Sequence, residues 1–281
     1  MKKKKNNMYR KRNLQLWTLA FPAVLLLLVF NYAPMFGIVL AFKDYKVPKG
    51  IFGSPWAGME NFKFFFESQD AARVIRNTLG LNLLFIVAGI VLGVIFALIM
   101  YEVKRPGQIK TYQTISIIPS FISWVAVGYI VYSLLDPTKV ILLIAKVWQS
   151  VGLGSIIYYA ALMGVDNDLY EAADMDGANK LQKTLHISIP QIVPIIIVMA
   201  LLDVGKIFRA DFGLFYNVTR DVGALYPTTD VIDTYVFRAL MQQGNIGMAS
   251  AVGLVQSVVC FVTLVTTNWI VKKISPENSL F

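Results

Sequence analysis

The stretch YEAADMDGANKLQKTLHISIP, residues 170–190, lies between two long apolar segments and decides how the rest of the chain is interpreted. It is short, polar and rich in small side chains. Three good helix N-cap residues precede it, and Asp168 with Glu171 three positions later predicts a variant of the capping box. Gly177 is expected to end this first helix, because glycine tolerates the left-handed conformation common at helix ends.

A second short helix is expected after this turn. Asp176 can cap a helix that runs from Ala178 to about Ile187, with its apolar residues near one stripe. Pro190 lacks an N–H and therefore suits the first turn of the apolar segment that follows. The alanines keep the helix–turn–helix slim enough to enter a cleft, and Glu171 offers a charge to a basic partner residue. The open alternative is a helical hairpin that only connects two spans.

The composition indicates a membrane protein. Hydrophobic residues make up 56% of the 281 residues, charged residues 15%, and the mean hydropathy is +0.59. A soluble globular protein has roughly 45–50% apolar and about 25% charged residues. Since lipid leaves a spanning backbone few ways to satisfy its hydrogen bonds, we expect an all-α membrane protein with six transmembrane helices. The predicted spans are residues 17–36, 79–100, 115–135, 140–163, 192–208 and 249–271.

Charge predicts the topology. The net charge is +9, and seven basic residues lie in the first twelve positions, beside an apolar run that is too long for a signal-peptide core. Residues 1–16 are therefore expected to be a basic cytoplasmic N-terminus, followed by a single transmembrane domain, 17–273, and a cytoplasmic tail, 274–281. An even number of spans places both termini and the loop 164–190 on the cytoplasmic side.

Polar side chains inside spans are costly and usually face the protein interior or a wet cavity. The spacing of Asp203, Lys206 and Arg209 by three predicts that they share one helix face, with an ion pair between Asp203 and Lys206. No catalytic residue or metal site is predicted, because His186 and Cys260 each stand alone. The candidates for a substrate path are Asn82, Ser123, Trp124, Asp203, Lys206, Arg209 and Gln256.

The polar stretch resembles the EAA signature of the integral-membrane permeases of ABC importers. The match rests on Glu171, Ala172, Ala173, Gly177, Ile187 and Pro190. Tyr170, Asp176 and Ala178 are similar to the carbohydrate branch of these permeases, as is the sequence at 58–62. The sequences at 233–238 and 251–254 are similar to the subgroup that handles larger oligosaccharides and polysaccharide fragments in Gram-positive bacteria. The connection at 136–139 is shorter than is usual in that subgroup.

The resemblance implies a permease in the cell membrane that moves a carbohydrate inward by alternating access. It implies four kinds of partner: a second homologous permease subunit, a cytoplasmic ATPase dimer, an extracellular solute-binding lipoprotein and membrane lipid. ATP and Mg²⁺ would be used by the ATPase, because this chain has no Gly-x-x-x-x-Gly-Lys-[Ser/Thr] loop and is expected to bind neither a cofactor nor nucleic acid. The implied ATPase-coupling residues are Tyr170, Glu171, Ala172, Ala173, Asp176, Gly177, Ala178 and Pro190.

Two other classes of protein remain as alternatives. A secondary transporter would not be driven by ATP, and such proteins often show inverted repeats, of which we see none here. An intramembrane enzyme would need a catalytic constellation such as Gly-x-Ser-x-Gly or His-Glu-x-x-His, and neither occurs in the sequence.

Lys206 and Arg209 would suit an acidic sugar such as a uronate.

Overall fold

Long apolar runs fold as helices in the computed structural model. The structure describes residues 2–103, 105–134 and 139–280, with side chains from Asn13 onward. Within these ranges there is no strand, and the β-pairing is limited to one isolated bridge between Lys43 and Trp56. Five helices are long and apolar enough to cross a membrane, or six if one bent pair counts as a span. The predicted all-α membrane fold is therefore confirmed.

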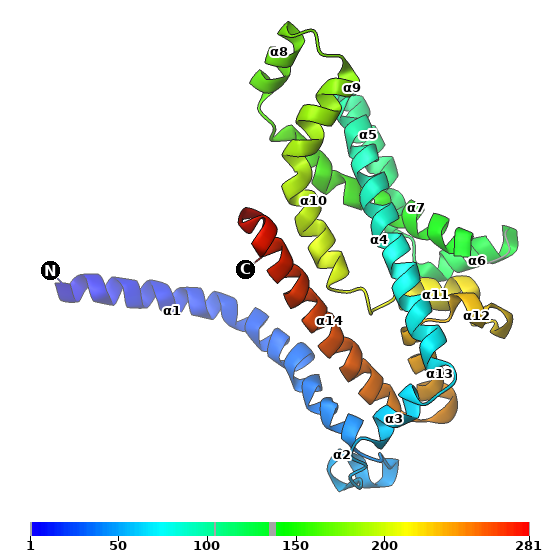
Figure 1. Ribbon diagram of the computed structural model, residues 1–281. Coiled ribbons are helices and arrows are strands. Elements are labelled where there is room, and N and C mark those ends of the chain that lie inside the picture. The colour runs from blue at the N-terminus through cyan, green and yellow to red at the C-terminus, as the bar shows by residue number, and fades with distance from the viewer. Residues whose placement is uncertain (1, 104, 135–138, 281) are drawn as a thin grey trace. The chain divides into compact units, whose positions relative to one another are not determined.

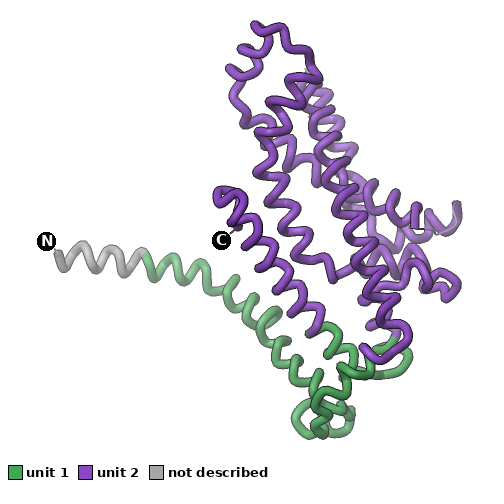
Figure 2. The backbone as a smooth tube through the Cα atoms, in the orientation of Figure 1, with its two compact units in different colours: residues 1–65, 239–254 green, residues 66–238, 255–281 purple. Residues whose placement is uncertain are grey.

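The helices gather into two compact units (Figure 2). Unit 1 comprises residues 1–65 and 239–254. In it, α1 (Lys2–Leu27) continues through a π turn (Leu28–Tyr32) into a 3₁₀ segment (Ala33–Phe42), so that the first span is longer than predicted. The shorter elements that follow are a 3₁₀ turn (Val47–Lys49), α2 (Gly50–Gly53) and α3 (Glu60–Phe66).

The end of the first span in unit 1 is held by the residues that follow it. The Asn61 amide donates hydrogen bonds to the carbonyls of Ala41 and Lys43, at 2.9 and 3.0 Å. The Phe42 ring stacks on Trp56, with the ring centroids 5.8 Å apart. These contacts satisfy the carbonyls that the ending helix leaves without intrahelical partners.

Unit 2 comprises residues 66–238 and 255–281 and is built around α4 (Ala71–Tyr101) and α7 (Lys139–Met163) (Figure 1). Apolar clusters of the described residues fill its interior. One cluster includes Leu81, Phe85 and Phe215, and another includes Val94 and Tyr158. The remaining helices with residues in this unit are α5 (Pro106–Ile117), α6 (Trp124–Leu134), α8 (Asn167–Met175), α9 (Lys180–Lys183), α10 (Ile189–Val204), α11 (Phe212–Thr219), α12 (Tyr226–Thr229), α13 (Ile232–Gln243) and α14 (Ile246–Ile274).

The predicted third span, 115–135, is not one straight helix. A 3₁₀ turn (Ile118–Phe121) follows α5, and α6 then continues at 90° to it. Pro119 contributes to the break because it has no N–H to donate, and the Gln149 amide donates to the freed Ile122 carbonyl at 2.9 Å. The short connection predicted at 136–139 lies outside the described residues, apart from Lys139.

Candidate functional site

The polar segment at residues 166–190, here called the elbow, begins with a capped helix. The Asp166 carboxylate accepts a hydrogen bond from the backbone N–H of Asp168 at 3.1 Å, and Asp166 is the N-cap of α8. Asp166 is one of the three predicted N-cap candidates, whereas the predicted capping box of Asp168 with Glu171 is wrong, since Asp168 already lies in the first helical turn. A carboxylate is favourable there as well, because it faces the positive end of the helix dipole.

The turn after α8 has the predicted geometry. Gly177 adopts φ +74°, a left-handed conformation that glycine reaches without steric cost. Next to it, the N–H of Ala178 donates to the Ala173 carbonyl at 2.9 Å, which satisfies one of the free carbonyls at the end of α8. The glycine therefore sets the angle at which the chain leaves α8.

The second elbow helix starts later than predicted. Asn179, not Asp176, is its N-cap, and Asn179 forms a reciprocal capping box with Gln182 at 2.9 and 2.7 Å. Asp176 instead follows the last residue of α8. The prediction failed because several polar residues at the turn can all cap, and the position of Gly177 in the turn decides among them.

Pro190 lies in the first turn of α10, as predicted, although α10 does not begin as an independent helix. From Lys180 to Val204 the chain forms one helical span, in which a π turn (Thr184–Ser188) ends two residues before Pro190. Proline cannot donate to the preceding turn, and a widened turn is a common response to such a missing hydrogen bond. As a consequence, the elbow continues directly into a membrane-spanning helix.

Few side-chain contacts hold the elbow to the rest of unit 2. The Tyr170 ring packs on Tyr101, the last residue of α4, at 6.0 Å, whereas the Tyr170 hydroxyl lies 2.9 Å from the Ser188 hydroxyl within the elbow itself. Lys180 pairs with Glu102 at 2.8 Å, and both side chains are exposed. The elbow is therefore anchored at the C-terminal end of α4 by one aromatic contact and one surface ion pair.

Much of the elbow surface faces outward. The coupling candidates Glu171, Ala172, Asp176 and Gly177 are exposed, and Ala173 and Ala178 are partly so. Figure 1 shows α8 and α9 at one end of unit 2, beyond α4 and α10. Four large apolar side chains are exposed on the same segment, namely Leu169, Met175, Leu181 and Leu185. A small surface that combines exposed apolar side chains with charges is typical of a docking site.

A second feature is a break in the chain after α10. The helix ends at Val204, and α11 begins at Phe212, so residues 205–211 lack a regular helix. The predicted span 192–208 therefore ends early, and the predicted helix face shared by Asp203, Lys206 and Arg209 does not form. No ion pair joins Asp203 to Lys206 in the described structure. Irregular backbone at membrane depth is tolerated where it is buried in protein or lines a cavity.

Polar side chains from three other helices hold this break. The Asn82 amide (α4) donates to the carbonyls of Ile207 and Arg209, at 2.7 and 3.0 Å. The Gln256 amide (α14) donates to the Phe208 carbonyl at 2.9 Å. The Asp233 carboxylate (α13) accepts from the Ala210 N–H at 2.8 Å and from Gln256 at 3.3 Å. Two of the predicted substrate-path residues, Asn82 and Gln256, thus have amides bound to backbone.

The break lines a cavity of about 450 Å³ between α4, α7 and the end of α10. Four predicted substrate-path residues, Asn82, Asp203, Lys206 and Arg209, line it. So do Lys146 and Asp211, which form an ion pair at 2.8 Å. Trp124 lies beside this pair and donates from Nε1 to the Asp211 carboxylate at 3.1 Å. Ser123 immediately precedes α6 and does not line the cavity.

Three of the residues at this site are not among those predicted from the sequence, namely Lys146, Asp211 and Asp233. Lys146 lies within the predicted span 140–163, and a lysine inside a span is itself a signal of a wet or protein-lined environment. Asp211 and Asp233 lie between the predicted spans 192–208 and 249–271, and hydropathy does not show that the break after α10 brings them to the cavity wall. Together they add one cation and two carboxylates to the surroundings of the broken helix.

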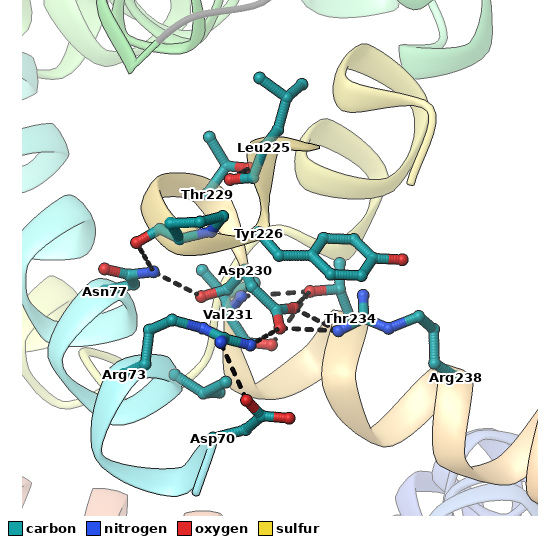
Figure 3. A network of polar contacts seen from close by, with 12 residues as sticks. Asp70, Arg73, Asn77, Leu225, Tyr226, Thr229, Asp230, Val231, Thr234 and Arg238 are labelled. Carbon is teal, nitrogen blue, oxygen red and sulfur yellow. Dashed lines mark hydrogen bonds and ion pairs between the residues drawn. The ribbon is translucent and has the colours of Figure 1, made fainter. Parts of the chain in front are cut away.

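The N-terminal end of α4, opposite to the end that contacts the elbow, takes part in a buried ionic network (Figure 3). The Asp230 carboxylate is completely buried and accepts from Arg238 at 2.7 Å through both oxygens, and from Arg73 (α4) at 3.4 Å. Asn77 (α4) donates to the Asp230 carbonyl at 3.1 Å. Asp221 completes the network by pairing with Arg238 at 2.8 Å. This network fixes the segment between α11 and α13 to the N-terminal end of α4.

Comparison with known proteins gives a consistent result. The family model described as the binding-protein-dependent transport system inner membrane component matches residues 89–276. Protein LplB of Bacillus subtilis (strain 168) is 32% identical, over 95% of this chain and 92% of LplB. The polygalacturonan/rhamnogalacturonan transport system permease protein YteP of the same organism is 30% identical, over 94% of this chain and 89% of YteP.

Two solved structures are similar along nearly their whole length. One is a crystal structure of a bacterial ABC transporter involved in the import of the acidic polysaccharide alginate, with a TM-score of 0.84, 30% identity, and coverage of 96% of this chain and 99% of that chain. The other is a bacterial alginate ABC transporter in complex with an alginate pentasaccharide-bound periplasmic protein. It has a TM-score of 0.80 and 30% identity over 94% of this chain and 96% of that one.

Proposed function

The chain belongs to the family of inner membrane components of binding-protein-dependent transport systems, and from this premise we propose that it is the permease subunit of an ATP-driven carbohydrate importer. It carries out no covalent chemistry itself. The observation that carries the proposal is the exposed elbow, which continues without interruption into the helix that ends at the 450 Å³ cavity.

The proposed motor is a separate ATPase dimer that docks on the elbow. The turn at Gly177 and the exposed apolar side chains supply the docking surface, while Glu171 supplies a charge for a basic partner residue. ATP and Mg²⁺ would be held by that dimer. The remaining proposed partners are a second permease subunit and an extracellular binding protein. The elbow and both termini would then lie in the cytoplasm of a bacterial, by its relatives Gram-positive, cell.

Coupling follows from the continuity of the elbow with α10. If the ATPase subunits move the elbow, the movement passes along residues 180–204 to the break at 205–211. The break lines the cavity, and a movement there changes which side of the cavity is open. ATP can shift this equilibrium only because the elbow makes different contacts in the two states.

The proposed cargo is an oligosaccharide or polysaccharide fragment. LplB and YteP are similar over nearly the whole chain, and YteP is named for the transport of polygalacturonan and rhamnogalacturonan. Within the cavity, Lys146 is neutralised by Asp211, whereas Arg209 bonds the Ser257 hydroxyl at 2.9 Å and Lys206 has no ion-pair partner among the described residues. Asp203 also lines the cavity, so its three cations exceed its two carboxylates by one positive charge, and this excess supports an acidic sugar as the cargo.

The experiment is uptake by the complete complex in proteoliposomes. We expect carbohydrate uptake that requires ATP, the ATPase and the binding protein. Uptake by the purified chain alone, without ATP, would instead support a secondary transporter. The double variant Lys206→Ala/Arg209→Ala is expected to reduce uptake of an acidic oligosaccharide by about tenfold or more, since each charge-assisted hydrogen bond contributes roughly 1.5–3 kcal/mol.

The matched control for this test removes two exposed cations outside the cavity, Arg105→Ala/Lys110→Ala, and should leave uptake unchanged. If the Lys206/Arg209 variant transports the acidic oligosaccharide as well as the wild type does, the acidic-cargo assignment is discarded. The importer assignment would survive that result, because it rests on the ATP dependence.

A further inference from the structure

Arg220 and Asp221 at the end of α11 adopt a backbone conformation that is uncommon for residues other than glycine, with φ of 51° and 52°. Such conformations persist where the surroundings hold them in place. Here the Asp221 carboxylate pairs with Arg238 at 2.8 Å, and its carbonyl accepts from the Tyr226 hydroxyl at 3.1 Å. The turn that results directs the Arg220 side chain back over α6.

The Arg220 guanidinium lies over two aromatic rings of α6. Its central carbon is 4.6 Å from the Tyr129 ring centroid and 4.0 Å from that of Tyr132. Both rings are more than half exposed, at 61% and 53%. Among the residues that the structure describes, no carboxylate pairs with Arg220. The stacking fixes the plane of the guanidinium while its N–H donors stay free for an anion.

The helices that carry these side chains are closely packed. A side chain at Gly128 of α6 would collide with the Asn217 carbonyl of α11, and one at Gly213 of α11 would collide with the Trp124 ring. Tyr216 is held in turn by Phe212 and Phe237, whose ring centroids are 5.1 and 5.0 Å away. The arrangement is therefore preformed, which lowers the entropic cost of binding a ligand.

A second cavity, of about 250 Å³, opens at this place and shares no lining residue with the cavity at the broken helix. Val125, Tyr129, Tyr216, Asn217 and Arg220 line it. It presents aromatic faces, a hydroxyl, an amide and a guanidinium. Two of the five lining residues are aromatic, and aromatic faces suit the C–H-rich faces of sugar rings, while the polar groups beside them can bind ring substituents.

We propose that this second cavity is a further saccharide subsite that selects an anionic sugar. A sugar ring would stack on Tyr129 with its carboxylate on the Arg220 guanidinium, and Asn217 and Tyr216 would meet its hydroxyls. This rests on the proposed carbohydrate function. An anionic lipid headgroup offers the same charge, but a headgroup would use Arg220 alone, whereas the polar floor suits a polyhydroxylated ligand.

The test is equilibrium binding of trigalacturonate and of its uncharged trimethyl ester to the complete importer complex in phosphatidylcholine nanodiscs, without the binding protein. Arg220→Asn removes the guanidinium and keeps a residue that tolerates the left-handed backbone. We expect it to weaken trigalacturonate binding by about tenfold and to leave the weaker binding of the ester unchanged. Tyr129→Leu, at an exposed ring, should weaken both ligands.

Arg105→Asn is the matched control, because it removes an exposed arginine far along the chain from the cavity. Unchanged trigalacturonate affinity in Arg220→Asn overturns the subsite. The same holds if, in a second set of nanodiscs that contain phosphatidylglycerol, Arg220→Asn lowers the retention of this lipid while trigalacturonate binding stays unchanged, which would make the site a lipid site. If ATP-dependent carbohydrate uptake persists in either case, the importer function stands. Absence of any such uptake by the wild-type complex would defeat that function separately.

Discussion

The two ends of α4 hold their neighbours in opposite ways. At the C-terminal end, Tyr101 and Glu102 contact the elbow through one ring pair and one ion pair whose side chains are 75% and 49% exposed. At the N-terminal end, Arg73 pairs with the Asp230 carboxylate, which has no exposed surface, and Asn77 donates to the Asp230 backbone carbonyl. Exposed ion pairs contribute little to stability, whereas breaking a buried pair is costly. The contacts at the C-terminal end of α4 are therefore easy to break and re-form, whereas those at its N-terminal end are expected to persist.

The cavity lies between these ends. With 31 residues at about 1.5 Å each, α4 is about 46 Å long, and Asn82 holds the broken helix about a third of the way along it. The N-terminal end of α4, which is firmly held, is the end nearer the cavity. The C-terminal end, whose contacts with the elbow are weak, is farther from it, so the elbow can move while the cavity end stays in place. The difference in burial therefore supports the proposal that the elbow moves while the network around Asp230 holds its end of α4 in place.

The largest effect is expected at the elbow, from Gly177→Val. An L-residue in the left-handed conformation costs about 1–2 kcal/mol, and a β-branched one more, so the turn should rearrange. We expect ATP-dependent uptake to fall by more than about tenfold, with insertion into the membrane unchanged. Gly177→Asn is the matched control, because asparagine tolerates this conformation and should retain most of the uptake.

Quantitative uptake in proteoliposomes and the amount of inserted protein are the two measurements for this pair. Wild-type uptake by Gly177→Val would refute the coupling role of the elbow. It would also mean that the weak contacts at the C-terminal end of α4 have no role in transmitting movement, so the difference from the buried N-terminal end would have no functional meaning.

The next effect concerns the buried end. Asp230→Ala leaves Arg238 without its bidentate partner, and we expect the free energy of unfolding in mixed micelles to drop by about 3–5 kcal/mol. Asp70→Ala removes the other carboxylate bound to Arg73, which is 44% exposed, and should cost less than about 1 kcal/mol. Equal losses in the two variants would show that burial does not distinguish these pairs.

The elbow could be predicted from the sequence better than the broken helix and its contacts could. Gly177 could be placed in a turn because its left-handed conformation is a local property, and the spans followed from hydropathy. The caps were misplaced, since neighbouring polar residues compete and differ little in energy. The broken helix at 205–211 was missed, because it depends on Asn82, Asp233 and Gln256, which are far from it in sequence and which no local pattern connects to it.

The smallest expected effect is a pH dependence that originates where α13 meets the break. Burial raises the pKa of the Asp233 carboxyl, and hydrogen bonds from Ala210 and Gln256 offset this only in part. The folded state therefore binds the proton more tightly than the unfolded state does. Stability should fall as the pH rises from the unfolded-state pKa, about 3.9, to the raised folded-state value, and then stay constant.

Asp233→Asn removes this titration and keeps a side-chain oxygen that can accept from Ala210, so its stability should vary less with pH over that window. The measurement is thermal unfolding of both proteins from pH 4 upward in the same detergent. Identical pH profiles would mean that Asp233 is not desolvated in the folded protein. In that case the break at 205–211 would be open to water. The residues around α13 would then hold the segment between α11 and α13 through Asp230, but Asp233 would not stabilise the cavity wall.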